Sequence, residues 1–245
     1  MEQYGDFAAL YDDLMQDIPY DRWAAFIMEC TGARRGDTGV DCACGTGSLT
    51  VRLSDKGLKM MGVDISESML EQAAQKARKA AQRIMFICQD IARLCLPKQV
   101  SLITCACDGV NYLDNIKKAE AFFSAAYRAL REGGAFIFDI STEYKFTHVL
   151  NGQLYYEDRE NVSYFWRNEF LPQHRLMNME LTFFVRKKNG EYTRFDETHV
   201  QRCYTEAELR ALLHTAGFKE IETYEDYTKQ PVGGQSMRIT FCARK

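Results

Sequence analysis

The chain has 245 residues, of which 46% are hydrophobic and 27% charged, so it can bury a sizeable core as one domain with additions or as two small domains. Acidic side chains outnumber basic ones by 34 to 31, which gives a net charge of −3. The chain has no long run of Lys and Arg, and this argues against a nucleic-acid backbone as its partner.

Targeting and redox signals predict a cytoplasmic protein. The acidic N-terminus lacks the basic segment and long apolar core of a signal peptide. No apolar run approaches the roughly 20 residues of a membrane span, so no membrane partner is expected. The nine cysteines lie mostly in apolar segments, as reduced buried thiols do. The C-x-C pairs Cys42/Cys44 and Cys105/Cys107 have a shorter gap than structural zinc sites use, so no metal is expected.

The first elements of the chain are predicted to be helices. Phe7, Leu10 and Leu14 recur at helical spacing in FAALYDDLM. A second helix is expected over 20–31, because a single apolar face precedes Gly32, which is a helix stop.

Strands and helices then alternate. Apolar runs predict strands at 38–43, 59–65, 83–90, 101–109 and 135–141. Helical periodicity predicts helices at 48–57, 67–82 and 117–134, the second with Ser66 as N-cap and the third closed by Gly133 and Gly134. This alternation is typical of an α/β protein with a doubly wound parallel sheet.

The pattern changes after Ser141. Long strand-like runs occupy about 143–202, and Asn189–Gly190 is a strong hairpin signal, so this region is predicted to be an antiparallel insertion. A capping box, Thr205 with Glu208, then opens another helix, and a hairpin closes the chain. We expect a core formed by 1–142 and 203–245 and an insertion, 143–202, that covers the active site.

The loop after the first strand, in VDCACGTGSLT, is rich in glycine and indicates close approach to a ligand. In open α/β sheets, ligands bind at the carboxyl ends of the strands. Phosphate-binding patterns fit poorly. A dinucleotide fingerprint starting at Gly45 would need a third glycine where Thr50 stands, and a P-loop would need a lysine that is missing here.

VDCACGTG instead resembles motif I of the class I S-adenosylmethionine (SAM)-dependent methyltransferases, commonly written LDLGCGTG. The resemblance covers about 40–141 and extends to an uncharacterised bacterial group of small-molecule methyltransferases. It implies a Rossmann-like, mostly parallel seven-stranded sheet, SAM as cofactor and S-adenosylhomocysteine as product. By the resemblance, Asp64 binds both ribose hydroxyls, Asp90 binds the adenine amino group and Ile91 flanks the ring. It also implies that Tyr11 and Tyr20 form a lid. The residues expected to bind the cofactor are Tyr11, Tyr20, Asp41, Ala43, Cys44, Gly45, Gly47, Asp64, Ile65, Met69, Asp90, Ile91 and Cys107.

Candidates for catalysis follow from position. Asp108 and Asn111 come after the fourth strand, and Asn111 is a candidate catalytic residue. His199 shares one face of a strand with Glu197 and Gln201, and its ordinary pKa suits a general base at neutral pH. The alternative is that this face is exposed to solvent. The basic residues that could bind an anionic acceptor are Arg167, Arg202 and Arg238.

The acceptor is predicted to be a small molecule, since the chain lacks the sequence signatures of amide-nitrogen and cytosine methylation and has no basic RNA-binding extension. A tRNA or protein acceptor is the first alternative. An NAD(P)-dependent oxidoreductase is the second, and a non-catalytic cofactor-binding module that regulates a partner is the third. That module would use an exposed apolar patch on the insertion, for which the candidates are Tyr164, Phe165, Trp166, Phe183 and Phe184. The sequence leaves the oligomeric state open.

Overall fold

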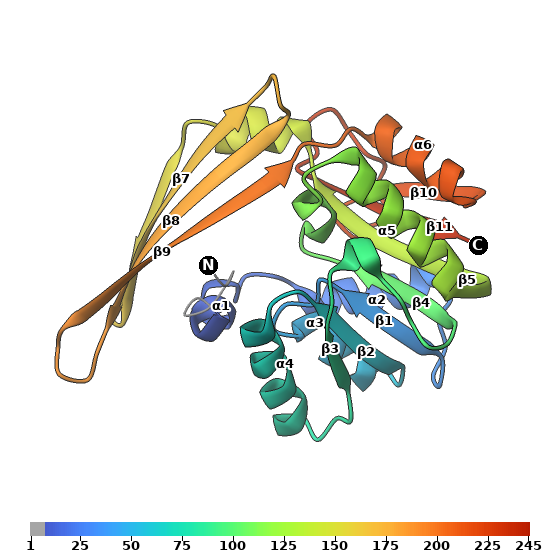
Figure 1. Cartoon of the computed structure of the whole chain (residues 1–245), viewed down its shortest axis with the longest axis horizontal. Helices are drawn as coiled ribbons and strands as arrows, with labels where there is room; N and C mark the ends of the chain where they lie inside the picture. The colour runs from blue at the N-terminus through green and yellow to red at the C-terminus, as the bar shows by residue number, and fades with distance from the viewer. Residues whose placement is uncertain (1–7) are drawn as a thin grey trace.

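The structure, a computed structural model, describes residues 8–245, which form a seven-stranded sheet flanked by helices and a separate four-stranded sheet (Figure 1). Phe7, the first residue of the expected N-terminal helical pattern, lies outside the described residues. Among residues 8–245, no helix combines the length and apolar character that crossing a membrane requires. The main helices are α1 (Ala8–Leu14), α2 (Tyr20–Thr31), α3 (Ser48–Asp55), α4 (Glu67–Lys79), α5 (Ile116–Ala129) and α6 (Glu206–Ala216).

The seven-stranded sheet has the strand order β10-β11-β5-β4-β1-β2-β3. Its strands are β1 (Thr38–Cys42), β2 (Lys59–Asp64), β3 (Met85–Cys88), β4 (Val100–Cys105), β5 (Leu130–Ser141), β10 (Glu220–Glu225) and β11 (Arg238–Arg244). Strands β1 to β5 pair in parallel, and β11 pairs antiparallel with both β5 and β10. The order reverses beside β1, so the loops after β1 and β4 diverge and leave a crevice. The Rossmann-like, mostly parallel sheet expected from the sequence is confirmed.

Helices cover both faces of this sheet because its strands are apolar on both sides. On one face, Phe122 and Phe123 of α5 pack with Phe136 and Phe138 of β5, and the ring centroids of these helix–strand pairs lie 5.2 to 5.6 Å apart. On the other face, Trp23 and neighbouring residues of α2 pack with α3 and the opposite side of the sheet. The sheet is therefore doubly wound and rigid, and the ends of its strands are fixed relative to one another.

The insertion forms the antiparallel sheet β6-β7-β8-β9. Its strands are β6 (Leu154–Asp158), β7 (Val162–Leu171), β8 (Leu176–Arg186) and β9 (Tyr192–Arg202). The expected hairpin is present, with Gly190 at a φ of 86° in the β8–β9 turn. The sheet reaches out from the end of the core near α6 and arches over α1 (Figure 1).

The structure departs from the sequence-based prediction most clearly at the end of α5 and at the start of the insertion. Helix α5 ends at Ala129 rather than at the glycines that follow, because fully buried Leu130 already pairs with Val100 of β4 as the first residue of β5. The insertion does not begin as a strand: a π-helical segment, η3 (Lys145–Leu150), precedes it and buries Phe146 and Leu150 beneath β7 and β8. Two short 3₁₀ turns, η1 (Ile91–Arg93) and η2 (Gly109–Tyr112), follow β3 and β4.

Helix α1 connects the core to the insertion. Ala8 packs in one cluster with Met69 of α4 and with Val162 and Phe183 of the four-stranded sheet. The guanidinium of Arg159, in the β6–β7 turn, donates to the backbone carbonyl of Asp13 at 2.6 Å. Because these contacts come from α4 of the core and from the four-stranded sheet, α1 forms a wall between the core and the insertion.

Candidate functional site

A cavity of about 570 Å³ lies between the carboxyl edge of the seven-stranded sheet and the inner face of the four-stranded sheet. One end is lined by the loops that follow β1, β2, β3 and β4. The other end is lined by side chains of β7, β8 and β9 and by η3, and α1 contributes Tyr11 and Leu14 to its wall. The cavity thus has two chemically different parts. We call the part lined by the loops after β1 to β4 the strand-end side, and the part lined by β7, β8, β9 and η3 the insertion side.

The glycine-rich loop after β1 runs along the strand-end side. Ala43, Gly45 and Gly47 have positive φ angles of 52°, 52° and 73°. Ala43 and Gly45 line the cavity together with Cys44. Gly47 has a different role from the expected one, because a Cβ there would lie 3.0 Å from the Cβ of Ala73. Its missing side chain lets α3 begin against α4, so Gly47 positions the loop rather than lining the cavity.

Asp64, at the end of β2, presents a fixed carboxylate to the cavity. Its two oxygens accept hydrogen bonds from the backbone amides of Gly45, at 2.8 Å, and Ser66, at 2.9 Å. Burial raises the pKa of Asp64, and the amide bonds partly oppose that effect. Each carboxylate oxygen can accept a further hydrogen bond, so the side chain can hold two ligand hydroxyls.

Asp41 lines the cavity but is almost fully buried. Its two oxygens accept hydrogen bonds from the hydroxyls of Thr50 and Thr104, both at 2.6 Å. Burial raises the pKa of Asp41 to about 6, even though these two hydroxyls favour the charged form. Asp41 therefore ties the base of the glycine loop to α3 and β4.

The remaining expected cofactor residues also face the cavity. Asp90 caps η1 by accepting from the amide of Ala92 at 2.9 Å, and Ile91 follows it in the wall. Ile65 and Met69 line the same side. This part of the cavity therefore alternates carboxylates with apolar side chains.

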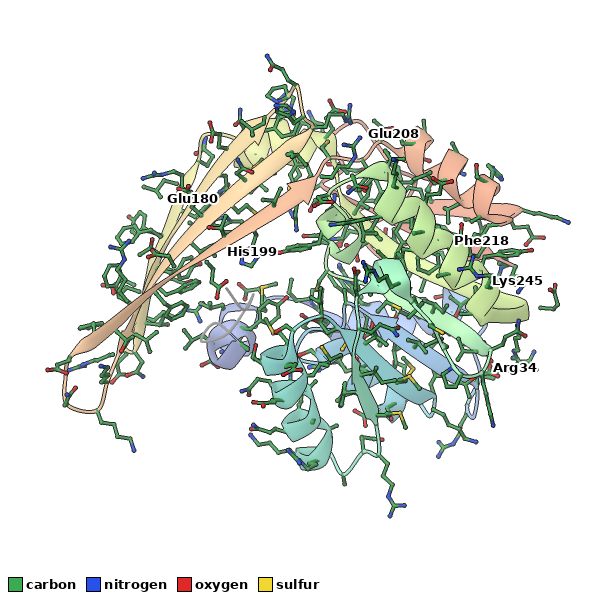
Figure 2. The ribbon with its side chains drawn as sticks, in the orientation of Figure 1. Arg34, Glu180, His199, Glu208, Phe218 and Lys245 are labelled. Atoms are coloured by element: carbon green, nitrogen blue, oxygen red, sulfur yellow. The ribbon has the colours of Figure 1, made fainter. Side chains whose placement is uncertain are left out.

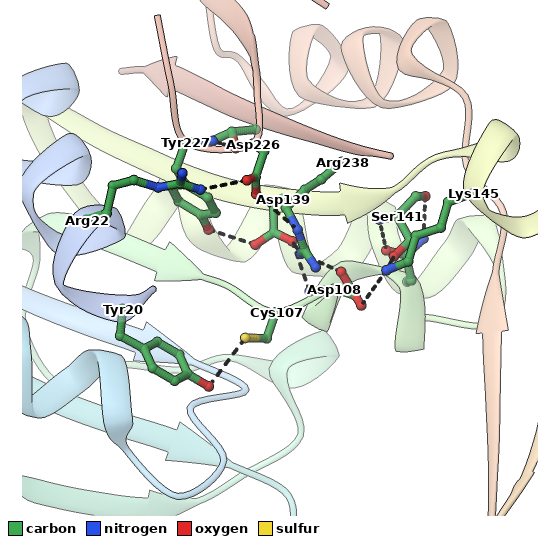
Figure 3. Close-up of polar contacts among 12 residues, drawn as sticks. Tyr20, Arg22, Cys107, Asp108, Asp139, Ser141, Lys145, Asp226, Tyr227 and Arg238 are labelled. Atoms are coloured by element: carbon green, nitrogen blue, oxygen red, sulfur yellow. Dashed lines mark hydrogen bonds and ion pairs between the residues drawn. The ribbon is translucent and has the colours of Figure 1, made fainter. Parts of the chain in front are cut away.

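Two aromatic residues from the N-terminal helices complete the strand-end side. Tyr11 lines the cavity from α1, and burial raises the pKa of its phenol well above the usual value. Tyr20, at the start of α2, makes a 3.6 Å contact through its hydroxyl with the sulfur of Cys107 (Figure 3). Cys107 follows β4 with a φ of 56° and also lines the cavity.

A polar contact that sequence reasoning missed holds α1 on the glycine loop. Asp12 accepts from the hydroxyl of Thr46 at 2.6 Å and from the ammonium of Lys76 at 2.7 Å. Lys76, on α4, also donates to Ser48 at 2.5 Å. Burial lowers the pKa of Lys76, and Asp12 opposes that effect. The adjacent Tyr11 is thereby fixed over the cavity, although nothing in the local pattern of Asp12 distinguishes it from a solvated acid.

A buried ionic cluster forms part of the cavity wall, and Figure 3 shows its hydrogen bonds and ion pairs. Arg238 of β11 donates to Asp108 at 2.5 Å and to Asp139 of β5, and Tyr227 donates to Asp139 at 2.7 Å. The Arg238 and Lys145 cations outweigh the effect of burial and lower the pKa of Asp108 to about 2, whereas burial raises the pKa of Asp139. Asp108, Lys145 and Arg238 line the cavity, so this charge network forms part of its wall.

The insertion side of the cavity is mainly aromatic and apolar. Tyr164, Trp166 and Phe183 line it, with Met179 and Leu181 between them. His199 points from β9 toward the core, while Glu180 points from β8 to the opposite side (Figure 2). His199 is 4% exposed, and burial lowers its pKa to about 4. The alternative that this face of β9 is exposed to solvent is therefore wrong, and Gln201 lines the same cavity.

Asn111 is not placed for catalysis. It is fully buried, and its amide nitrogen donates to the backbone carbonyls of Ser141 and Arg202 at 3.4 and 2.9 Å. Its side-chain oxygen accepts from the amide of Ser141 at 2.9 Å. Asn111 thus joins β5 to the end of β9 behind the cavity wall.

Some of the other basic and aromatic candidates face the cavity, and others lie on the outer surface or beside α6. Arg167 pairs with Glu180, and both are largely exposed, while Arg202 pairs with Glu208 at 3.7 Å beside α6. Tyr164, Trp166 and Phe183 face the cavity, but Phe165 is 47% exposed and its ring contacts Phe184. The five aromatic residues therefore do not form one exposed patch.

Comparisons with known proteins give a consistent result. Residues 40–134 match the family model described as a methyltransferase domain. "Putative methyltransferase YqeM" of Bacillus subtilis (strain 168) is 34% identical and covers 99% of this chain and 97% of its own length. "Putative methyltransferase GWCH70_2453" of Geobacillus sp. (strain WCH70) is 35% identical and covers 99% of this chain and 99% of its own length.

Solved structures agree with these relatives. A crystal structure of a SAM-dependent methyltransferase from Clostridium acetobutylicum ATCC 824 has a TM-score of 0.89 with 35% identity and covers 98% of both chains. The sugar N-methyltransferase KedS8 from Streptoalloteichus sp ATCC 53650 has a TM-score of 0.78 with 19% identity and covers 98% of this chain and 93% of its own. The second likeness shows a shared fold.

Proposed function

Since the chain belongs to the class I SAM-dependent methyltransferases, we propose that it transfers the methyl group of SAM to a small-molecule acceptor. The observation that carries this proposal is the single cavity of about 570 Å³ that joins the strand-end side to the insertion side. The first side suits the cofactor, and the second suits a compact, partly apolar acceptor. Family membership rules out the alternative of an NAD(P)-dependent oxidoreductase.

The residues of the strand-end side fit the chemistry of SAM. Asp64 would hold the ribose hydroxyls, since both its oxygens are oriented by backbone amides and retain accepting capacity. Asp90 would accept from the adenine amino group, and Ile65 and Ile91 supply apolar surface for a flat ring. Gly45 has open space where a Cβ would project, so a ligand can approach its backbone closely.

The insertion side supports a small acceptor. Most of its wall consists of aromatic and aliphatic side chains from β7 and β8, with polar groups restricted to a few positions. Such pockets typically hold small molecules, with the few polar groups fixing their orientation. The sugar N-methyltransferase that shares the fold acts, by its name, on a small molecule, which agrees with this proposal.

The mechanism requires positioning of the two substrates, and a proton acceptor where the attacking group carries a proton. Bound SAM, held by Asp64, Asp90 and the glycine loop, would supply an electrophilic methyl group on its sulfonium. The insertion side would hold the acceptor's nucleophile in line with that methyl group, so that the carbon–sulfur bond could break as the new bond forms. His199 would accept the acceptor's proton, since it lies on the insertion side and its imidazole is neutral at pH 7. Burial lowers its pKa to about 4, so it is a weaker base than the solvated imidazole expected from the sequence. The wall formed by α1 and the four-stranded sheet would exclude water.

We expect His199→Gln to lower kcat about a hundredfold, because a positioned general base contributes at least about that much. Affinity for S-adenosylhomocysteine should stay within about twofold, since His199 lies on the insertion side. Transfer by the wild-type protein should also decline as the pH falls toward 4, where His199 gains a proton. Glu180→Gln, on the opposite face of the sheet, is the matched control. A kcat for His199→Gln equal to that of the control would contradict the assignment.

The acceptor class can be tested directly with SAM that carries a labelled methyl group. The protein is incubated with three fractions of a bacterial extract: dialysable small molecules, RNA, and proteins. We expect protein-dependent label in the small-molecule fraction. Label confined to RNA or to proteins would replace this proposal with a tRNA or protein acceptor. Cofactor binding without label in any fraction would favour a regulatory module.

A further inference from the structure

The search for further sites leads to the end of α2 that is far from the cavity. Cys30 lies in the last turn of α2, about 15 Å along the helix axis from Tyr20 at a rise of about 1.5 Å per residue. Glu222 of β10 and Cys242 of β11 are directly opposite each other in the antiparallel pair. Opposed residues of such a pair project from the same face, so Glu222 and Cys242 share the face that α2 covers.

These three side chains converge. The sulfurs of Cys30 and Cys242 and a carboxylate oxygen of Glu222 all lie within 4.8 Å of one another. Among residues 8–245, they are the one set of three metal-ligating side chains so gathered. The C-x-C pairs at the ends of β1 and β4 do not take part in such a group, and the two cysteines here are 212 residues apart in the chain.

We propose that Cys30, Glu222 and Cys242 form a binding site for one divalent zinc ion. Two sulfurs and one carboxylate oxygen are a donor set that suits zinc, with water as the fourth ligand. Zinc bonds of about 2.3 Å to sulfur and 2.0 Å to oxygen put tetrahedral ligand atoms about 3.5 to 3.8 Å apart. The three ligand atoms lie within 4.8 Å of one another, an upper limit about 1 Å above this spacing, so side-chain rotations would bring them to the ion.

Burial and charge support the same site. Cys30 is 5% and Cys242 1% exposed, whereas Glu222 is exposed. The two sulfurs would therefore bind the ion from the protein interior, and the ion would enter from solvent past Glu222. Binding would release one proton from each thiol and leave one net negative charge on the complex. The guanidinium of Arg244, which donates to the carbonyl of Cys30 at 2.6 Å, would offset that charge.

The consequence would be structural. The ion would join the end of α2 to the β10–β11 hairpin. The two otherwise meet through apolar contacts, hydrogen bonds from the Arg244 guanidinium to backbone carbonyls of α2, and exposed ion pairs. Because zinc binds the folded state, a hundredfold excess over its dissociation constant should raise the Tm by about 5 °C or more.

The test uses Co²⁺ and Zn²⁺ alone on the full chain, kept reduced by a phosphine, in a Cys88→Ser/Cys95→Ser background that removes the exposed thiols. We expect one equivalent of Co²⁺ with sulfur-to-cobalt charge-transfer absorption, displaced by Zn²⁺. Cys30→Ser and Cys242→Ser should each lose this absorption, and Glu222→Gln should weaken binding about tenfold or more. Cys203→Ser, which removes a buried thiol that packs against the insertion, is the matched control and should keep it.

Two results with the cysteine variants and their background would overturn the site, in addition to a third with Glu222→Gln. One is a background protein without the charge-transfer band, and the other is a band of unchanged affinity in folded Cys30→Ser and Cys242→Ser proteins. If either serine variant fails to fold by circular dichroism, Glu222→Gln decides, because its side chain is exposed. Unchanged Co²⁺ affinity in that variant also overturns the proposal. None of these readouts depends on methyl transfer.

Discussion

Asp64→Ala is expected to weaken SAM binding about a thousandfold while the protein stays folded. The variant would lack the two charge-assisted hydrogen bonds that the Asp64 carboxylate makes to the ribose, each contributing about 2 kcal/mol. Their sum of about 4 kcal/mol corresponds to three orders of magnitude in the dissociation constant. Isothermal titration calorimetry with SAM and with S-adenosylhomocysteine measures the change, and circular dichroism reports folding.

The control for Asp64 must disturb the same helix end without removing the carboxylate. Ser66→Ala does so, because the Ser66 hydroxyl caps α4 by accepting from the amide of Met69 at 3.3 Å. That substitution should cost about 1 kcal/mol of stability and leave SAM affinity nearly unchanged. If folded Asp64→Ala binds SAM as tightly as Ser66→Ala does, Asp64 does not bind the ribose.

Arg238→Met is expected to lower the free energy of unfolding by about 3 to 5 kcal/mol, the cost of breaking a buried ion pair by removing one partner. Asp139 is fully buried and Arg238 13% exposed, so loss of the guanidinium leaves Asp108 and Asp139 facing each other without a counter-ion between them. Urea denaturation at pH 7 measures the change. The stability that ionised Asp108 provides is present above a pH of about 4 and is lost as the pH falls toward its lowered pKa of about 2.

Two further variants separate the ionic effect from lost packing. Arg22 forms an ion pair with Asp226 at 2.7 Å, with side chains 51% and 40% exposed, so Arg22→Ala should cost less than about 1 kcal/mol. Adding Asp139→Asn to Arg238→Met should recover part of the loss, because one unpaired buried carboxylate is removed. A cost for Arg238→Met no larger than that for Arg22→Ala would show that the cluster contributes little.

The insertion illustrates where local patterns mislead. Its long strands were predictable because alternating residues and the Asn189–Gly190 turn are short-range signals. Strand β6 was missed because it is a short, largely exposed edge strand that depends on pairing with β7. Segment η3 was missed because it depends on burial against β7 and β8. Similarly, the residues 127–130 have helical propensity, but pairing with β4 takes Leu130 out of α5.

The sequence by itself determined the alternation of strands and helices, the glycine-rich loop and most of the strand-end side of the cavity. Those residues follow consecutive parallel strands, and parallel pairing brings such positions to one edge whatever the rest of the chain does. Only the tertiary structure decided the rest. Asp12 meets Lys76, His199 turns toward the cavity, and Arg238 reaches Asp108 across 130 residues of sequence. These contacts join distant segments, and the burial of whole helix and sheet faces, rather than any local pattern, fixes which segments meet.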